Sequence, residues 1–517
     1  MLARVRSAAV LGIDGYVVDV EADLANGLPS FSTVGLPHGA VKEGRERVTA
    51  ALLNSGFDAP LKRITVNLAP ADIRKEGTGF DLPIAIALLA ASEQLPGARL
   101  DGYLLVGELG LEGDLRPVRG ALSVALAARS AGCRGLILPG ANAREAAVVS
   151  GLEVLGPATL RAVVSHFTGE TPLAPVPETP WPFATRVAAE PVDFADVRGQ
   201  PAAKRALEVA AAGGHNILLI GPPGSGKTML ARRLPGILPD LTLEEALETT
   251  RIHSVAGLLP PGQPFLVQRP FRAPHHTISD AGLIGGGPTP RPGEVSLAHG
   301  GVLFLDELPE FRRNVLEVLR QPLEDGIVTL SRAAVSLTYP CRFTLAAAMN
   351  PCPCGHEGDG QRPCRCDPMV VERYLGRLSG PLLDRIDLQI RVPAVRPAEL
   401  GLESAEEASA VIRGRVAEAR ERQRHRLAGL AGLHANAHLG PRELRRFCRL
   451  QPAGDELLRT AIIRLGLSAR AYHRLLKVAR TIADLAGTEQ IETPHLAEAI
   501  QYRTLDRPRG RAMAGAT

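Results

Sequence analysis

The segment Gly221-Pro-Pro-Gly-Ser-Gly-Lys-Thr228 decides the fold, because it matches the phosphate-binding pattern G-x-x-x-x-G-K-[ST]. Four apolar residues, 217–220, precede it as a predicted strand, and a helix is predicted from Met229. Loop N–H groups and a helix N-terminus then face a phosphate group. We predict that Lys227 supplies a positive charge and Thr228 a magnesium ligand; the alternative is a chance glycine-rich turn. The predicted loop comprises Gly221, Pro222, Pro223, Gly224, Ser225, Gly226, Lys227 and Thr228.

A second short apolar run, residues 302–305, ends in Asp306 and Glu307. In a parallel sheet, a carboxylate at the end of a neighbouring strand can reach the magnesium ion, and a second one can activate the attacking water. We therefore predict Asp306 as the metal-side acid and Glu307 as the catalytic base. The alternative is that both are solvated charges that end a strand.

Two more polar groups follow along the chain. A third predicted strand, residues 343–349, ends at Asn350, which can hold the water, although asparagine is also a common turn residue. Arg385 lies between two carboxylates in the segment 382–387. It forms either a structural ion pair or an arginine finger that reaches the γ-phosphate of a neighbouring subunit.

In this order, the motifs resemble the YifB/ComM family of magnesium-chelatase-like AAA+ ATPases. The resemblance covers nearly the whole chain, including residues 270–279 and 291–294. It implies ATP and Mg²⁺ as cofactors and a homo-hexameric ring with ATP sites shared between subunits. It further implies that Asn350 is sensor 1, Arg385 the trans-acting finger and Arg470 sensor 2, with Arg474 as the alternative to Arg470.

The resemblance also implies a function. Competence members of the family are DNA helicases that promote branch migration in homologous recombination during natural transformation, so DNA and recombination proteins are expected partners. The alternative is a chelatase-like ATPase that remodels a protein partner. The insertion before Asp306 contains a Gly-Gly-Gly run at 285–287 and Arg291, which fit either a DNA phosphate contact or a subunit contact.

Residues 1–168 resemble the Lon-protease-like, ribosomal-S5-like α+β fold that also occurs in RadA. An active Lon domain needs a serine nucleophile and a lysine that accepts its proton. Those positions fall at about Gly79 and Leu122, and neither side chain can carry out acyl chemistry. We therefore expect a binding or assembly module and no active protease.

The whole chain of 517 residues predicts an α/β fold with three domains and one linker. These are the Lon-like domain (1–168), a proline-rich linker (169–192), an AAA+ P-loop core (193–395) and a C-terminal helical lid with a basic face (396–517). Residues 411–480 hold sixteen Lys and Arg against five Asp and Glu, whereas the whole chain carries a net charge of +4. This basic surplus fits DNA phosphates, acidic neighbours in a ring, or solvent.

Four cysteines fall within fifteen residues of a Gly- and Pro-rich loop: Cys352, Cys354, Cys364 and Cys366. Four thiolates at this spacing can close a tetrahedral structural zinc site, and His356 can replace one of them. The two C-x-C pairs are tighter than the usual C-x-x-C spacing. The alternative is four reduced cysteines without a metal.

The composition excludes several classes of protein. Hydrophobic residues make up 45% and charged residues 22%, which excludes an intrinsically disordered chain. The longest apolar run, residues 84–91, is shorter than the roughly 18 residues that span a bilayer, so no membrane partner is expected. An odd total of seven cysteines is a poor disulfide framework and predicts a reducing, cytoplasmic location.

Overall fold

The computed structural model describes residues 1–179, 192–260, 263–287, 290–332, 335–360, 362–394, 406–430 and 432–503. Two compact units divide the chain. The first comprises Met1–Thr185 and Leu243–Leu266, and the second comprises Arg186–Thr242 and Val267–Thr517. Residues 180–191 of the predicted linker, the predicted boundary at 395–396 and the end of the predicted lid from 504 on lie outside the described residues.

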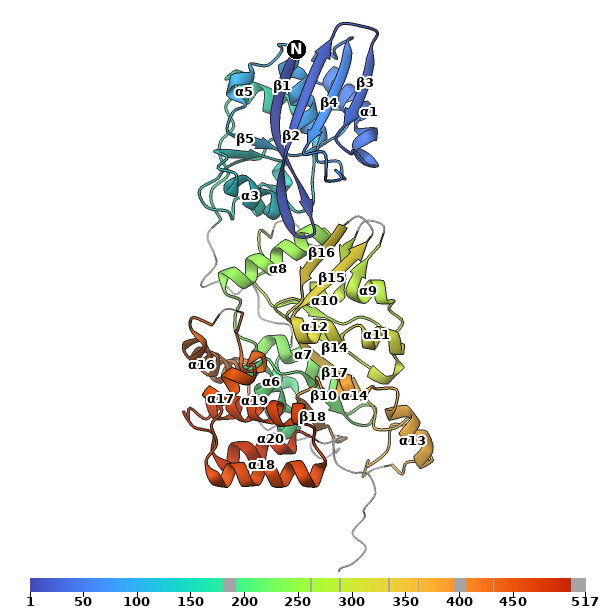
Figure 1. Ribbon diagram of the computed structural model, residues 1–517, viewed down its shortest axis with the longest axis vertical. Helices are drawn as coiled ribbons and strands as arrows, with labels where there is room; N and C mark the ends of the chain where they lie inside the picture. Colours follow the sequence, from blue (N-terminus) through green and yellow to red (C-terminus); the bar gives the residue numbers. More distant parts are fainter. Residues whose placement is uncertain are drawn as a thin grey trace, which may run out of the picture. The chain divides into compact units, whose positions relative to one another are not determined.

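A seven-stranded sheet forms the centre of the first unit, in the order β3-β4-β2-β1-β5-β8-β9 (Figure 1). Its long antiparallel hairpin pairs Leu2 with Asp23 through to Leu11 with Asp14, while β5, β8 and β9 are parallel. Alternate residues of β2, including Val18, Val20 and Ala22, are buried because successive side chains of a strand face opposite sides. The strands are β1 (Leu2–Leu11), β2 (Asp14–Ala25), β3 (Ser30–Val34), β4 (Arg63–Ala69), β5 (Tyr103–Leu105), β8 (Gly135–Ile137) and β9 (Glu153–Leu155), with a separate pair β6 (Glu108–Leu109) and β7 (Leu115–Arg116).

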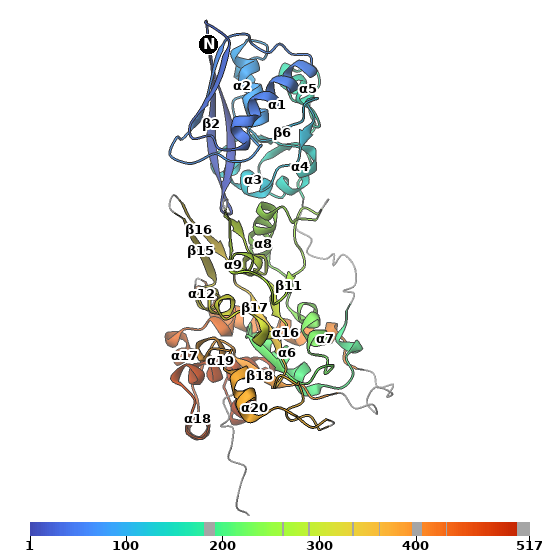
Figure 2. The ribbon, with the colours of Figure 1, turned by 90° about the vertical axis from the view of Figure 1, so that its right-hand side faces the viewer.

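Helices cover both faces of this sheet. Helices α1 (Ala40–Asn54), α2 (Asp81–Ala91) and α5 (Leu160–Thr168) share one apolar core with it, and Figure 2 shows all three on one side of β2. Helices α3 (Ala121–Ser130) and α4 (Gly140–Ala146) belong to a second core. Helix α2 is buried on almost every side because its sequence is apolar all round.

Helix α8 (Leu243–Ala256) also belongs to the first unit, although its neighbours in sequence lie in the second. It packs against α3. The Ser254 hydroxyl donates a hydrogen bond to the buried Glu145 carboxylate, and Arg251 pairs with Asp14. Burial raises the pKa of Glu145, and the Ser254 hydroxyl opposes that shift. The segment between the P-loop helix and Asp306 is thus anchored in the first unit by a buried polar contact.

The second unit is built on a parallel five-stranded sheet in the order β11-β14-β17-β10-β18. Strands β10, β14 and β17 are buried along their whole length, as expected where helices cover both faces. The prediction of an α/β fold with a parallel sheet is confirmed. The strands are β10 (Ile217–Ile220), β11 (Phe271–Arg272), β14 (Val302–Leu305), β17 (Thr344–Met349) and β18 (Leu388–Arg391).

Helices of the lid close one face of this sheet. Helices α16 and α19 pack against α6 and α7 around one apolar core, and the described chain after residue 406 is otherwise formed by further helices (Figure 1). The helices of this face are α6 (Pro201–Gly213), α7 (Lys227–Ile237), α16 (Ser409–Leu427), α17 (Pro441–Phe447), α18 (Pro452–Leu465), α19 (Ala469–Leu485) and α20 (Thr493–Gln501).

The opposite face carries short helices and two hairpins around a separate core. The hairpins pair β12 (Gly285–Gly286) with β13 (Arg291–Pro292) and β15 (Ile327–Arg332) with β16 (Val335–Pro340). A side chain at Gly285 would place its Cβ 2.4 Å from the carbonyl oxygen of Arg291, so the first hairpin needs glycine there. The short helices are α9 (Asp280–Ile284), α10 (Glu294–Leu297), α11 (Arg313–Glu317), α12 (Arg320–Asp325), α13 (Pro368–Leu375) and α14 (Gly380–Leu383).

Candidate functional site

The loop between β10 and α7 has the backbone that a phosphate cradle needs. Gly224 and Gly226 have φ angles of 76° and 87°, in the left-handed region that favours glycine. A Cβ on Gly221 would lie 2.1 Å from the carbonyl oxygen of Val392, so the loop also needs glycine for close packing against the chain that follows β18. Glycines therefore fix both the curvature of the loop and its contact with the sheet.

Lys227 begins α7 with its ammonium group inside the loop. Its Nζ donates hydrogen bonds to the carbonyl oxygens of Gly221 (2.7 Å) and Pro222 (2.8 Å), and to Oδ1 of Asn350 (3.3 Å). The residue is 8% exposed. Burial lowers the pKa of Lys227, and Asp306 opposes that shift. The ammonium is bound to neutral oxygens, which phosphate oxygens can replace with stronger, charge-assisted hydrogen bonds.

Thr228 and Asp306 meet although 78 residues separate them. The Thr228 hydroxyl donates to Asp306 Oδ2 at 2.6 Å, and Asp306 Oδ1 accepts the Glu307 N–H at 2.9 Å. Because β14 and β10 run parallel on either side of β17, their carboxyl ends meet at one edge of the sheet. A hydroxyl and a carboxylate side by side are oxygen ligands that Mg²⁺ prefers, so these residues fit a magnesium ion held with a nucleotide.

Glu307, the predicted base, has a left-handed backbone with φ 53° and a side chain that is 58% exposed. Its Oε2 lies 3.2 Å from Nδ1 of His276, whose ring packs edge-on against Phe311. No role for His276 was predicted from the sequence. The signal was present, because His276 lies in the segment 270–279 that carries the family resemblance.

Arg385 lies at the other end of the sheet from the P-loop. Its carbonyl oxygen accepts a hydrogen bond at 2.9 Å from Asn216, the residue before β10, whereas the P-loop follows β10. Arg385 is 6% exposed, and its guanidinium donates to the carbonyl of Pro381 at 2.6 Å and forms an ion pair with Glu324. The structure therefore does not bring Arg385 to the nucleotide loop of its own chain.

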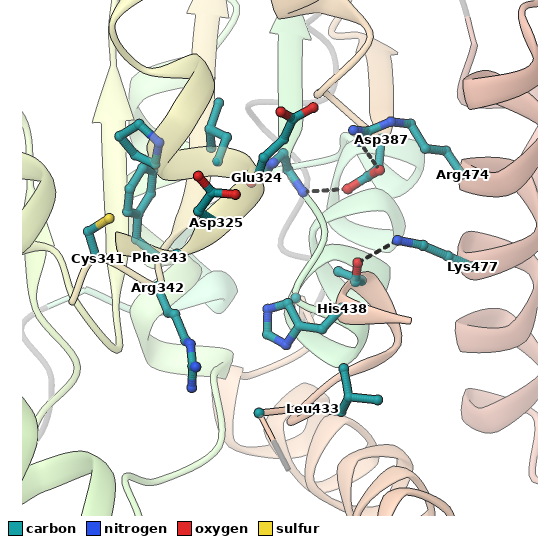
Figure 3. A pocket seen from close by; sticks show the side chains of 17 residues that line it. Glu324, Asp325, Cys341, Arg342, Phe343, Asp387, Leu433, His438, Arg474 and Lys477 are labelled. Carbon is teal, nitrogen blue, oxygen red and sulfur yellow. Dashed lines mark hydrogen bonds and ion pairs between the residues drawn. The ribbon is translucent and has the colours of Figure 1, made fainter. Parts of the chain in front are cut away.

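The two sensor 2 candidates also lie at this end. Arg474 pairs with Asp387 at 2.5 Å, and Asp387 Oδ2 lies 3.5 Å from the buried His215 ring. Arg470 is exposed and, with Arg385 and Arg474, helps to lower the pKa of Glu324, for which the Arg385 hydrogen bond is the main cause. A cavity of about 340 Å³ opens here, lined by residues of α12 and α19 and by Asp387, which precedes β18. Figure 3 shows Glu324, Asp387, Arg474 and Lys477 around it.

The four predicted cysteine ligands converge. Their sulfur atoms all lie within 4.8 Å of one another, and all four cysteines are free thiols. His356 is not part of this group, because its Nδ1 pairs with Asp359 at 3.0 Å. The arrangement offers a set of four sulfur ligands that suits a tetrahedral metal ion.

Comparison with known proteins decides the family. Models of the magnesium chelatase subunit ChlI match residues 193–400, its C-terminal part matches 406–503, and a further ChlI model matches 20–142. The YifB protein of Salmonella typhimurium and the competence protein ComM of Haemophilus influenzae are each 48% identical over 98% of both chains. The chain belongs to the YifB/ComM family of magnesium-chelatase-like AAA+ ATPases. This membership implies an ATPase that uses ATP and Mg²⁺, in a family that is typically oligomeric.

The Lon resemblance is supported in part. Lon protease 2 of Bacillus subtilis is 32% identical over 28% of each chain. In this YifB/ComM member, Leu122 is fully buried, and Gly79 lies against Val106. Nearby, the Thr78 hydroxyl donates to Glu108 and Lys75 is buried.

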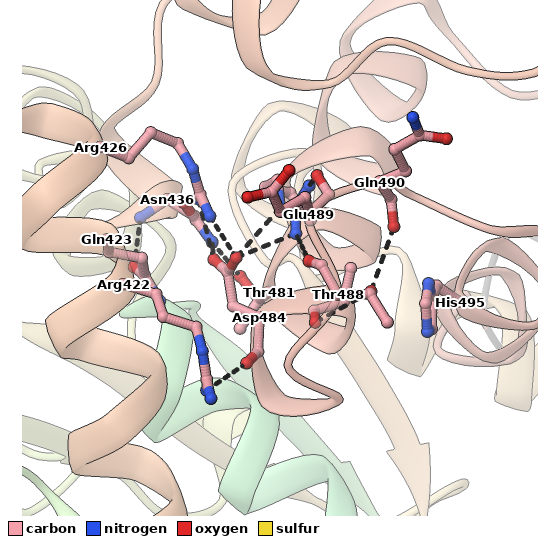
Figure 4. Close-up of polar contacts among 12 residues, drawn as sticks. Arg422, Gln423, Arg426, Asn436, Thr481, Asp484, Thr488, Glu489, Gln490 and His495 are labelled. Atoms are coloured by element: carbon pink, nitrogen blue, oxygen red, sulfur yellow. Dashed lines mark hydrogen bonds and ion pairs between the residues drawn. The ribbon is translucent and has the colours of Figure 1, made fainter.

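The basic segment of the lid is divided between core and surface. Arg426 and Arg480 both bind the buried Asp484 carboxylate, which also accepts from Asn436 at 2.8 Å (Figure 4). Arg426 joins α16 to α19, whereas Arg480 lies on α19 itself and donates to the carbonyl oxygens of Thr488 and Glu489, so both guanidinium groups are used inside the fold. The exposed arginines of α17 and the turn after it are Arg442, Arg445, Arg446 and Arg449.

Among the described residues, no helix combines the length and the apolar character that crossing a bilayer requires.

Proposed function

We propose that the protein is a hexameric, ATP-driven DNA helicase of the cytoplasm that promotes branch migration in homologous recombination during natural transformation. The position of Arg385 is the observation that supports a ring of subunits. It lies at the edge of the sheet opposite to the P-loop. An arginine that completes an ATP site from there must do so in a neighbouring subunit.

In this proposal each residue of the site has one role. Lys227 binds phosphate oxygens, and Thr228 and Asp306 hold Mg²⁺, which neutralises phosphate charge. Glu307 accepts a proton from the attacking water, and Asn350 orients that water at the carboxyl ends of β14 and β17. Arg385 of the next subunit stabilises the charge that develops on the γ-phosphate, with Arg470 or Arg474 beside it.

DNA is favoured as the substrate by two observations. A relative that matches over 98% of its length is named a competence protein. The exposed arginines of α17, with Arg291 at the exposed end of the β12–β13 hairpin, offer charges for phosphates. The alternative, a motor that remodels a protein, is favoured by the magnesium chelatase matches and by the burial of Arg426 and Arg480.

A branch-migration assay tests this proposal. The purified full chain, ATP and a three-stranded DNA substrate should give products on a gel, with ATP hydrolysis stimulated by single-stranded DNA and falling steeply between 50 and 200 mM salt. Arg445→Gln combined with Arg446→Gln should weaken the stimulation several-fold. Arg459→Gln is the matched control, because Arg459 is exposed but already paired with Asp455. Hydrolysis that DNA leaves unchanged would overturn the assignment to DNA.

A further inference from the structure

We propose that Cys352, Cys354, Cys364 and Cys366 bind one structural Zn²⁺ and that this metal braces the nucleotide site, by holding the P-loop at Pro223 and the strand end at Asn350. The metal site stands on its own. The brace rests on the proposed function, since it assigns a regulator to the ATP site.

The sulfur positions suit zinc. The sulfur–sulfur separations are 3.4 Å for Cys352 and Cys354, 3.7 Å for Cys352 and Cys364, and 3.6 Å for Cys354 and Cys364. A tetrahedral ion with Zn–S bonds of about 2.3 Å holds its ligands about 3.8 Å apart. A disulfide brings the sulfurs to about 2.05 Å. The four thiols therefore already surround a volume of the size of one tetrahedral ion.

Backbone hydrogen bonds of the loop hold the thiols in place, as is usual around metal-binding cysteines. The Cys366 N–H donates to the Cys364 sulfur at 3.4 Å, and a turn closes from the Gly355 N–H to the Cys352 carbonyl at 2.9 Å. Hydrogen bonds of this kind fix the orientation of ligating sulfurs.

This loop touches the nucleotide site directly. Gly355 has φ 85°, and a Cβ there would lie 2.5 Å from Cδ of Pro223 in the P-loop. A Cβ on Gly358 would lie 3.0 Å from a guanidinium nitrogen of Arg391, at the end of β18. The cysteine loop therefore lies against the lip of the phosphate cradle and against the strand beside it.

The loop is also connected to Asn350. Cys352 follows Asn350 by two residues, and α13, which follows the loop, presents Tyr374 to the backbone of Asn350. Burial raises the pKa of Tyr374 to about 12, and the hydrogen bond from Asn350 opposes that shift. Asn350 in turn accepts from Lys227. Between β17 and α13, the described residues form turns and irregular chain, so the four thiols are the strongest available crosslink.

Metal content tests the site. The full chain, purified without chelators, should contain about one zinc per protomer by elemental analysis. Replacement with Co²⁺ should give the intense thiolate-to-metal absorption and the visible bands of a tetrahedral site. Cys364→Ser should lose most of the zinc, and Cys133→Ser, a buried cysteine of the first unit, should keep it. A folded wild-type chain that binds neither metal would overturn the site.

A glycine pair tests the brace without removing a ligand. Gly355→Ala should push against Pro223 and weaken binding of a fluorescent ATP analogue about tenfold, while zinc content stays near one. Gly360→Ala is the matched control, because a Cβ there meets nothing within 4 Å, and it should bind the analogue normally. Equal affinities for the two variants would overturn the brace. Neither assay uses DNA, so a failure of branch migration would overturn the proposed function and leave this result unaffected.

Discussion

The two edges of the five-stranded sheet hold their polar groups in different ways. At the edge where strands end, Lys227, Thr228, Asp306 and Asn350 are joined by single hydrogen bonds that a ligand can replace. At the edge where strands begin, Arg385, Asp387 and Arg474 are held in buried or half-buried ion pairs. In the proposed function, the first set exchanges partners with a nucleotide, whereas the ion pairs of the second set hold its geometry.

This difference indicates that the residues of the proposed ATP site are divided between the two edges of the sheet. Strand β10 has four residues, which at about 3.3 Å each separate the two edges by roughly 13 Å. A side chain that starts at the far edge and is tied there to Glu324 does not reach the phosphate loop of its own chain. The predictions below test this division, beginning with the largest expected effect.

Removing the charge inside the phosphate loop should have the largest effect. Lys227→Ala removes the ammonium that the loop carbonyls and Asn350 surround, so ATP binding should fall below detection and hydrolysis should be lost. Equilibrium binding of a fluorescent ATP analogue measures this. Glu307→Gln is the matched comparison: it keeps the loop intact and should bind ATP but not turn it over. ATP binding by Lys227→Ala as tight as in the wild type would place the nucleotide elsewhere.

A substitution at the edge that holds the arginines should lower ATP turnover and leave ATP binding unchanged. Arg385→Ala should keep ATP affinity near the wild-type value and lower kcat by about 10³-fold, the size expected of an arginine finger. Arg377→Ala, an exposed arginine paired with Glu310, is the control for lost charge. Mixing Arg385→Ala with Lys227→Ala protein should restore part of the activity, because intact halves of the site then meet. No recovery on mixing would contradict a shared site.

The sequence was sufficient to predict those parts of the candidate site that depend on contiguous residues or on regular strand geometry. The residues of the P-loop are contiguous in sequence. The pairing of Thr228 with Asp306 follows from the geometry of parallel strands, so both residues of that pair could be predicted. The convergence of the four cysteines also followed from their spacing. The roles of all these residues, and those of Glu307, Asn350, Arg385 and Arg470, remain predictions.

Contacts between distant segments were beyond the sequence. Helix α8 joins the first unit through Glu145, which lies 109 residues before its partner Ser254, and no local pattern encodes that choice. Charge counting likewise could not separate the buried Arg480 from the exposed arginines of α17, since burial depends on where Asp484 lies. Periodicity reports which face of an element is apolar and leaves open what covers it.

His276 offers a finer test of the strand-end edge. Its ring contacts the exposed Glu307 carboxylate, so His276→Ala should let that side chain move and lower kcat about tenfold with little change in KM. Steady-state hydrolysis separates the two constants. His275→Ala is the matched control, because His275 stacks on His276 but pairs with Thr277. A larger effect from His275 than from His276 would contradict a positioning role for His276.

The smallest expected effect concerns the strand-start edge and its dependence on pH. Burial lowers the pKa of His215 although Asp387 opposes the shift, so the folded chain keeps this ring neutral. Below about pH 6.5 the unfolded chain takes up a proton that the folded chain does not, and stability falls by up to about 1.4 kcal/mol per pH unit. Burial would raise the pKa of Asp387, but Arg474 and His215 hold it below its usual range, so its contribution persists until about pH 4.

Between pH 6.5 and 4, protonation of His215 in the unfolded chain, rather than of Asp387, therefore lowers the stability, and the two edges should differ in acid sensitivity. His215→Gln should lower Tm at pH 7.5, because it loses the contact with Thr481 at 2.8 Å, but its Tm should fall less on acidification than that of the parent. His425→Gln, at an exposed site, should keep the parental slope. Parallel pH profiles for parent and His215→Gln would mean that this ring already carries its proton in the folded chain, and the far edge would then hold one more positive charge beside Arg474.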